Sequence, residues 1–171
     1  MKLILETERL LLRPFALTDC NDLFQMNADP LVVQYTGDGP FKNLEDARNL
    51  ILNDNQYQKY KMGRLSVIRK SDGNFLGWCG LKYHTSEHIV DIGYRFYRQY
   101  WGFGYATEAA LTCIKDGFER LQLEAIYGHV HINNTASEKV LEKCGLKFIK
   151  NITYDQTPAK LYAIYREEFY T

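Results

Sequence analysis

The sequence predicts a single α/β domain that spans residues 1–171. Its length suits one domain with one core. Short strand-like segments alternate with helical periods, in the order β-α-α-β-β-β-α-β-α-β-β. Hairpins in this order predict antiparallel strands, whereas a strand-helix-strand unit in the second half predicts a parallel pair. We therefore expect a mixed sheet with helices on its faces.

The first 60 residues predict one strand and two helices. Residues 9–14 form a short strand closed by proline. Thr18 or Asp19 is expected to cap a helix that ends near residues 29–30. Residues 35–41 are dense in turn residues and predict an exposed loop. Apolar residues near helical spacing predict a second helix over residues 44–60.

From residue 64 onward we expect six strands and two helices. The strands are expected over residues 65–68, 75–81, 89–96, 125–132, 146–153 and 161–169. The helices are expected from the glycines after residue 100 to about residue 121, and over residues 136–143. An Asp72-Gly73 turn joins the first two strands in a hairpin. The last two strands are expected to be an antiparallel pair.

Composition excludes several broad classes of protein. Lys plus Arg and Asp plus Glu are balanced at 21 each, so neither nucleic-acid nor membrane binding is expected. No signal-peptide pattern occurs, and no apolar run approaches the roughly 20 residues that span a bilayer, so we expect a cytoplasmic protein. Cys20, Cys79, Cys113 and Cys144 are widely spaced, which favours reduced thiols over disulfides or a bound metal. A homodimer is left open.

Residues 98–109, Arg-Gln-Tyr-Trp-Gly-Phe-Gly-Tyr-Ala-Thr-Glu-Ala, join a predicted strand directly to a predicted helix. Gly102 and Gly104 permit backbone conformations closed to other residues and leave no side chain in front of the amides. The first N–H groups of a helix have no partner within it, and the helix dipole places about half a positive charge there. The junction therefore predicts a site for a phosphate or pyrophosphate.

Three other interpretations of these glycines compete with that hypothesis. A dinucleotide-binding fingerprint requires a third glycine, where Thr107 stands, and repeated parallel βαβ units. A P-loop requires Gly-Lys-Ser/Thr after the glycines, and this triplet is absent. A tight strand-to-helix turn without any ligand is compatible with the two glycines alone.

Four motifs occur in one order between residues 7 and 149. They are residues 7–14, Ile92-Gly93-Tyr94, residues 99–109, and the pattern Asn134-x-x-Ser137-x-x-Val-Leu-Glu-Lys-x-Gly-Leu. Within the third, Gln99-x-x-Gly102-x-Gly104 has the Q/R-x-x-G-x-G/A form of the acetyl-coenzyme A signature of the GNAT N-acetyltransferase superfamily. Together the motifs resemble the RimJ/RimL-type branch of that superfamily.

The resemblance implies that two central parallel strands splay apart and hold acetyl-coenzyme A as co-substrate. Backbone amides after Gln99 would hold the pyrophosphate, and the main chain of residues 96–98 would pair with the pantetheine arm like an added strand. Asn134 matches a position that contacts the cofactor arm, although it also suits a helix N-cap. The expected cofactor-binding residues are Phe96, Tyr97, Arg98, Gln99, Trp101, Gly102, Phe103, Gly104, Tyr105, Ala106, Asn134 and Ser137.

Acetyl transfer requires a neutral amine, attack on the thioester carbonyl, and protonation or stabilisation of the leaving thiolate. Many GNAT enzymes place a tyrosine acid in the last helix, where this chain has Leu141. Ser137 is therefore the expected hydrogen-bond donor to the thiolate.

The base that accepts the amine proton has several candidates. His129 and His131 fall on one side of their strand together with Tyr127, and an imidazole titrates near neutral pH. Asp91 and Glu87 are the alternatives.

The acceptor is an amine whose identity the resemblance leaves open. A protein N-terminal amine is the leading class, and a small-molecule amine such as a polyamine, amino sugar or antibiotic is the second. Residues 35–41 and the region around Tyr83, His84 and Glu87 are expected to border the acceptor site. Leu141 also leaves open a catalytically silent acyl-coenzyme A-binding module.

Overall fold

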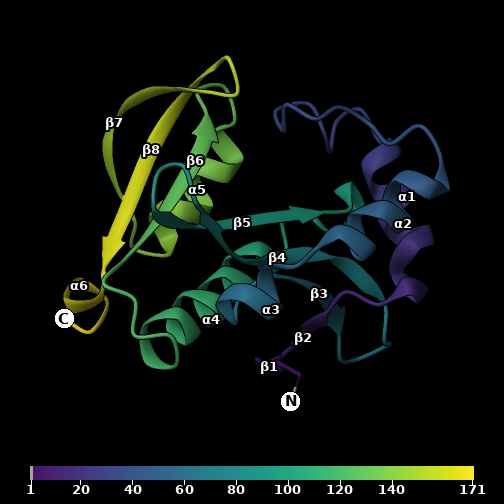
Figure 1. Ribbon diagram of the computed structural model, residues 1–171, viewed down its shortest axis with the longest axis horizontal. Helices are drawn as coiled ribbons and strands as arrows, with labels where there is room; N and C mark the ends of the chain where they lie inside the picture. Colours follow the sequence, from purple (N-terminus) through teal and green to yellow (C-terminus); the bar gives the residue numbers. More distant parts are fainter. Residues whose placement is uncertain (1) are drawn as a thin grey trace.

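The computed structural model describes residues 2–171, which build one mixed sheet of eight strands (Figure 1). The strands lie in the order β1-β2-β3-β4-β5-β6-β8-β7, and only β5 and β6 are parallel neighbours in this described part. Their bounds are β1 (Leu5–Glu6), β2 (Leu10–Pro14), β3 (Arg64–Arg69), β4 (Phe75–His84), β5 (Ile89–Phe96), β6 (Ala125–His131), β7 (Lys147–Tyr154) and β8 (Thr157–Tyr165). The expected mixed sheet is confirmed.

The helices are α1 (Cys20–Ala28), α2 (Leu44–Asn53), α3 (Gln56–Tyr60), α4 (Tyr105–Glu119), α5 (Thr135–Lys143) and α6 (Arg166–Phe169). Short 3₁₀ turns precede α1, at Leu17–Asp19, and α4, at Arg98–Tyr100. Among residues 2–171, no helix has the length and apolar character that a membrane crossing requires.

Four predictions of local structure are wrong or incomplete. The helix expected over residues 44–60 is broken, because Asp54 is extended and its carboxylate accepts the N–H of Gln56, which starts α3. Asp19 is the N-cap residue of α1, but its side chain makes no cap hydrogen bond to this helix and pairs with Arg13. The last strand begins and ends earlier than expected, because Glu168 caps a terminal helix at the N–H of Tyr165. The short strand β1 was not expected.

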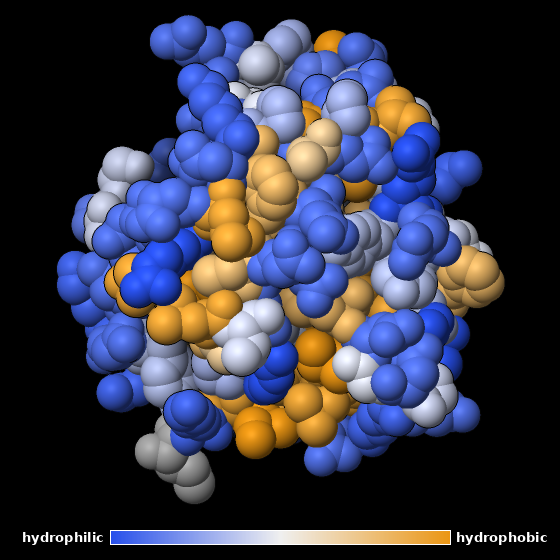
Figure 2. Space-filling model, turned by 90° about the vertical axis from the view of Figure 1, so that its right-hand side faces the viewer, coloured by the Kyte–Doolittle hydropathy of each residue, from blue (hydrophilic) through white to orange (hydrophobic). Residues whose placement is uncertain are grey.

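Two hydrophobic cores cover opposite faces of the sheet. One face packs against α4 and α5 through a large cluster that includes Leu76, Ile92, Ile114 and Leu141. The other packs against α1 and α2 through Leu23, Met26, Val33, Ala47 and Phe75. Figure 2 views the molecule from the α1 and α2 side, where apolar residues also reach the surface. The exposed large apolar side chains of this part are Leu17, Leu31, Leu44, Leu50 and Leu52.

The sheet opens between its two parallel strands. Strands β5 and β6 are paired at one position, where Asp91 lies opposite Tyr127. β5 follows its antiparallel partner β4 along its whole length, and β6 follows β8 in the same way. Because each strand keeps a different partner, β5 and β6 diverge beyond Asp91, as the resemblance implied (Figure 1). The wedge between them leads toward the glycine turn before α4.

Candidate active site

The turn before α4 presents a row of unpartnered backbone amides. Gly102 and Gly104 have φ angles of 83° and 80°, in the left-handed region that favours glycine. Gly104 is the N-cap residue of α4. Within the described chain, the N–H groups from Gly102 to Thr107 donate no hydrogen bond, whereas that of Glu108 bonds to the Gly104 carbonyl at 3.0 Å. This geometry suits an anion such as a pyrophosphate.

The start of the chain fixes this turn in place. Glu108, in the first turns of α4, accepts hydrogen bonds from the Thr7 hydroxyl at 2.5 Å and from the Arg9 backbone N–H at 3.0 Å. Arg9 also pairs with the Glu108 carboxylate at 2.7 Å and donates to the Phe103 carbonyl at 3.0 Å. Burial alone would raise the pKa of Glu108, but the bonds from Thr7 and Arg9 outweigh it and lower this pKa. The Thr-Glu-Arg motif near the N-terminus therefore braces the amide turn.

Replacing Glu108 by glutamine is expected to loosen the turn while the residues of the turn itself stay unchanged. Loss of the charged acceptor lowers the free energy of unfolding by about 1.5–3 kcal/mol, since hydrogen bonds to charged groups contribute that much. The affinity for acetyl-coenzyme A falls as well, because the amides are held less firmly. Urea unfolding and calorimetry measure the two effects. Glu119→Gln, near the far end of α4, is the matched control; equal losses in both variants would contradict this bracing role.

The open edge of β5 offers backbone groups to the wedge. Tyr97 directs its N–H toward β4, where it bonds to the Leu76 carbonyl at 3.0 Å. Alternation along an antiparallel pair then directs the backbone groups of Tyr94 and Phe96 toward β6. The Phe96 carbonyl already accepts the indole N–H of Trp101 at 3.0 Å. Phe96 and Tyr94 therefore lie on the edge where an added strand would pair, while the backbone of Tyr97 faces the sheet.

The other predicted cofactor residues surround this edge. Arg98 lies in the 3₁₀ turn, and its side chain pairs with Asp29 at 3.0 Å. Gln99 is exposed next to it. Trp101 and Phe103 are exposed aromatic side chains on either side of Gly102. The ring of Tyr105 is buried below the guanidinium of Arg9, and Ala106 is half-buried in the first turn of α4.

Ser137 and Asn134 lie at the start of α5, across the wedge from β5. Asn134 is the N-cap of α5, since its carboxamide oxygen accepts the N–H of Ser137 at 3.2 Å. The Ser137 hydroxyl donates to the Tyr94 hydroxyl at 3.0 Å, and Tyr94 in turn donates to the Ser137 carbonyl at 2.8 Å. Burial raises the pKa of Tyr94, so its hydroxyl stays protonated. The sequence pattern did not single out Tyr94 as the partner of Ser137.

Leu141 has a packing role. It is buried, and a Cβ added at Gly128 would lie 2.8 Å from its side chain. Glycine on β6 therefore allows α5 to approach the sheet closely, and this position of the helix is filled by an apolar core side chain.

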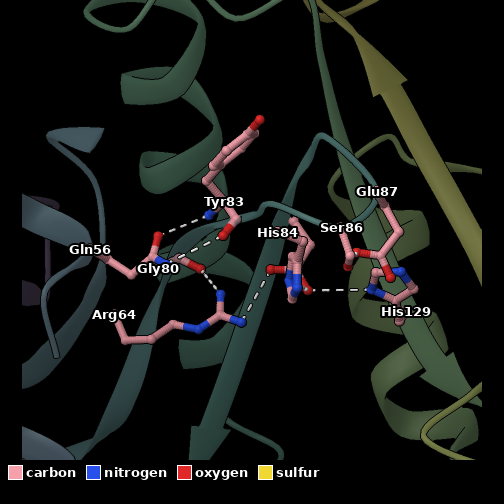
Figure 3. Close-up of polar contacts among 9 residues, drawn as sticks. Gln56, Arg64, Gly80, Tyr83, His84, Ser86, Glu87 and His129 are labelled. Atoms are coloured by element: carbon pink, nitrogen blue, oxygen red, sulfur yellow. Dashed lines mark hydrogen bonds and ion pairs between the residues drawn. The ribbon is translucent and has the colours of Figure 1, made fainter. Parts of the chain in front are cut away.

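A carboxylate and two imidazoles meet where β5 and β6 join. The Asp91 carboxylate lies 3.3 Å from Nδ1 of His129 and 3.1 Å from Nε2 of His84. Its other oxygen accepts from Arg64 at 3.1 Å, and Arg64 also donates to the Gly80 carbonyl. Figure 3 shows Arg64 and His129 pointing toward His84 from opposite sides. A Cβ at Gly93 would lie 2.7 Å from the Arg64 guanidinium, so a larger residue there would displace this guanidinium.

Asp91 is held as a buried carboxylate. Burial alone would raise its pKa, but the positive charge of Arg64, the hydrogen bond from His129 and the nearby imidazole of His84 reverse this effect and hold the pKa of Asp91 well below its usual range. An ionised Asp91 accepts the Nδ1 proton of His129, which leaves Nε2 as the basic nitrogen of the neutral ring. Tyr154 stacks on this ring with 4.3 Å between the ring centroids. The arrangement suits a base.

The other predicted bases are placed differently. His131 shares the face of Tyr127 and His129 on β6, as expected from strand alternation. Its Nδ1 accepts the N–H of Asn133 at 3.1 Å, and its ring stacks on Tyr35 at 5.0 Å. Glu87 is exposed in the turn after β4, and a hydrogen bond from Ser86 lowers its pKa. Figure 3 shows both Ser86 and Glu87 beside His129.

An open groove of about 270 Å³ adjoins this cluster. Side chains from α3, from the end of β4 and from the following turn line it, including Lys59, Tyr60, Tyr83, His84 and Ser86. Because His84 faces both the groove and Asp91, the groove leads toward the imidazole pair. Within residues 2–171, no set of three or more histidine, cysteine or acidic side chains is arranged to hold a metal ion.

A sheet split between two parallel strands, with an unpartnered amide turn at its open end, has the form that the resemblance to acetyl-coenzyme A-dependent transferases implies. The family model described as an acetyltransferase (GNAT) domain matches residues 9–147. An uncharacterised N-acetyltransferase, p20, from Bacillus licheniformis is 35% identical over 167 residues, which cover 94% of this chain and 92% of that protein. The chain therefore belongs to the GNAT acetyltransferase family, whose members are acetyl-coenzyme A-dependent acyltransferases.

Solved structures support the same fold. A GNAT-family acetyltransferase from Bacillus anthracis superposes with a TM-score of 0.85 at 28% identity, over 96% of this chain and 99% of that one. Spermidine N-acetyltransferase from Vibrio cholerae, solved with coenzyme A and spermine, shares the fold with a TM-score of 0.81 at 17% identity, over 96% of this chain and 100% of that one.

Proposed function

We propose that this protein transfers the acetyl group of acetyl-coenzyme A to a primary amine, as an enzyme of the RimJ/RimL-like branch acting in the cytoplasm. A protein N-terminal amine is the leading acceptor class, and a small-molecule amine is the second. The observation that carries the proposal is the pair formed by Asp91 and His129 at the vertex of the wedge, on the side of the sheet opposite α4 and α5. The cofactor then enters along the edge of β5, and the amine approaches from the other face.

The chain supplies each chemical step through a named group. Nε2 of His129 accepts the proton of the incoming ammonium or of the attacking amine, and Asp91 stabilises the imidazolium that forms. The neutral nitrogen attacks the thioester carbonyl, and the carbon–sulfur bond breaks with its electron pair on sulfur. The Ser137 hydroxyl, which donates to the Tyr94 hydroxyl in the free enzyme, donates to the thiolate instead. The Tyr94 hydroxyl can then donate to the hydroxyl oxygen of Ser137. Positioning of an already activated acetyl group supplies further rate.

Ser137→Ala is expected to lower turnover by about 10-fold or more while leaving the affinity for acetyl-coenzyme A within a factor of about two, because the lost hydrogen bond stabilises the leaving thiolate only in the transition state. Tyr94→Phe keeps the ring and removes the partner hydroxyl, so a smaller loss in turnover is expected. Steady-state rates and calorimetry separate the two quantities. Unchanged turnover in Ser137→Ala would remove its role.

A thiol-release assay over peptides, polyamines and amino sugars tests the proposal itself. Release of coenzyme A above the acceptor-free rate identifies the amine class, and mass spectrometry of the product shows whether the acetyl group is on the amine nitrogen. Binding of acetyl-coenzyme A without release by any amine would favour a catalytically silent acyl-coenzyme A-binding module.

A further inference from the structure

Arg95 is a nearly buried cation on the face of β5 that carries Asp91. Residues Asp91, Gly93 and Arg95 alternate along the strand and therefore share one face. Only 13% of the Arg95 side chain is exposed, and its guanidinium lies against the ring of Trp78 at 5.4 Å. Burial lowers the pKa of this guanidinium from its ordinary value. A buried charge is costly unless it is paired.

The pairing of Arg95 is incomplete. Its Nε is buried and has no hydrogen-bond partner within residues 2–171. One terminal nitrogen donates to the Asn27 side chain and lies 3.4 Å from the Asp38 carboxylate, which is 52% exposed. By contrast, both terminal nitrogens of Arg64 donate hydrogen bonds, one to Asp91 and one to the Gly80 carbonyl. The guanidinium of Arg95 is therefore incompletely paired, and a further anion can pair with its positive charge.

The loop that supplies Asp38 lies across the mouth of the wedge. Tyr35 stacks on His131 of β6, and Asp38 reaches Arg95 of β5, so one short segment touches both diverging strands. A Cβ at Gly37 would lie 4.0 Å from that of Asp155, in the turn between β7 and β8. Figure 1 shows this segment, between α1 and α2, reaching toward the tip of the β7–β8 hairpin. An amine that approaches His129 on this face passes the loop.

We propose that Arg95 binds a carboxylate of the acceptor, and that Asp38 holds the place of this carboxylate in the free enzyme. The inference rests on the proposed function and narrows its acceptor to amines that carry a carboxylate. An α- or ω-amino acid supplies that group, and so does a peptide whose first residue is aspartate or glutamate. Substrate binding exchanges the exposed, weak partner Asp38 for a carboxylate that can pair with the guanidinium at two points, because guanidinium groups favour bidentate pairs.

Matched acceptors test the proposal. One arm compares amino acids with their carboxamides, and a second compares peptides that begin with Asp or Glu with peptides that begin with Asn or Gln. Dissociation constants are measured by calorimetry on the full chain loaded with coenzyme A, and kcat/KM is measured by thiol release. The carboxylate member is expected to bind at least about 10-fold more tightly in one arm, which identifies the source of the carboxylate. Equal binding of acid and amide in both arms would overturn the proposal.

Two variants distinguish recognition from a structural role. Arg95→Gln is expected to abolish the preference for the acid while the amide keeps its affinity, and Asp38→Asn is expected to lower KM for the acid alone. Arg120→Gln, an arginine paired with Asp116 near the end of α4, is the control. Equal losses for acid and amide in Arg95→Gln, with no effect of Asp38→Asn, would overturn the proposal. Carboxylate-selective binding without any acetyl transfer would support the role of Arg95 in carboxylate binding and contradict the proposed function.

Discussion

Gly102→Ala is expected to weaken acetyl-coenzyme A binding by roughly 10-fold or more, since a side chain at this position obstructs the approach of the pyrophosphate to the amides. The φ angle of Gly102 is 83°, and a Cβ added there meets no atom within 4 Å. The added methyl therefore points into the open space in front of the amide turn, where we place the pyrophosphate. This steric obstruction acts on the ligand, whereas the backbone strain lowers the stability of the protein and the core is untouched. Calorimetry with acetyl-coenzyme A measures the loss.

Gly73→Ala is the matched control for this experiment. Gly73 has a φ angle of 75° and also meets no atom within 4 Å of its added Cβ, but it lies in the hairpin turn between β3 and β4. Both variants are expected to lose similar thermal stability, because the backbone strain is the same in kind. Only Gly102→Ala loses affinity for the cofactor. Equal affinities in the two variants would show that the turn is structural and holds no pyrophosphate.

The glycine junction could be predicted because its information is local. Left-handed glycines, a helix start and the absence of side chains in front of the amides follow from consecutive residues. The alternation that places Tyr127, His129 and His131 on one face of β6 is equally local and is confirmed. Local patterns failed where a side chain redirected the backbone, as at Asp54, whose bond to the Gln56 N–H divides the expected helix in two.

The carboxylate partner of His129 could not be read from the sequence because it depends on register. From the sequence, Asp91 and Glu87 are two alternative bases. Only the pairing of β5 with β6 at Asp91 and Tyr127 sets Asp91 close to His129, two residues further along β6. Arg64 and His84 come from two other strands and reach the same carboxylate. Likewise, the N-cap role of Asn134 can be predicted from its neighbours in the sequence. The hydrogen bond between Tyr94 and Ser137 cannot, because it joins residues 43 positions apart.

His129→Gln is expected to reduce kcat by about 100-fold at neutral pH, the lower end of what general base catalysis contributes. Glutamine keeps a hydrogen bond to Asp91 within reach but has no basic nitrogen. The deficit is expected to shrink as the pH rises above about 8, because an α-amine then loses its proton without help. A merely structural histidine would give a loss that does not depend on pH in this way. The pH profile of kcat/KM from thiol release measures both effects.

His131→Gln distinguishes the two histidines that the strand pattern made equivalent. Nδ1 of His131 already accepts the N–H of Asn133, and its ring supports Tyr35, so the expected change is in KM for the acceptor more than in kcat.

Asp91→Asn should resemble His129→Gln, because a neutral amide no longer stabilises the imidazolium. The pKa of Asp91 is lowered in the folded state, so the stability it gives is present above about pH 4 and is lost as the pH falls below that value. Acid unfolding should therefore separate Asp91→Asn from both histidine variants. If His131→Gln reproduced the pH-dependent loss of kcat instead, the base would be His131, and Asp91 and His129 would serve to join β5 to β6.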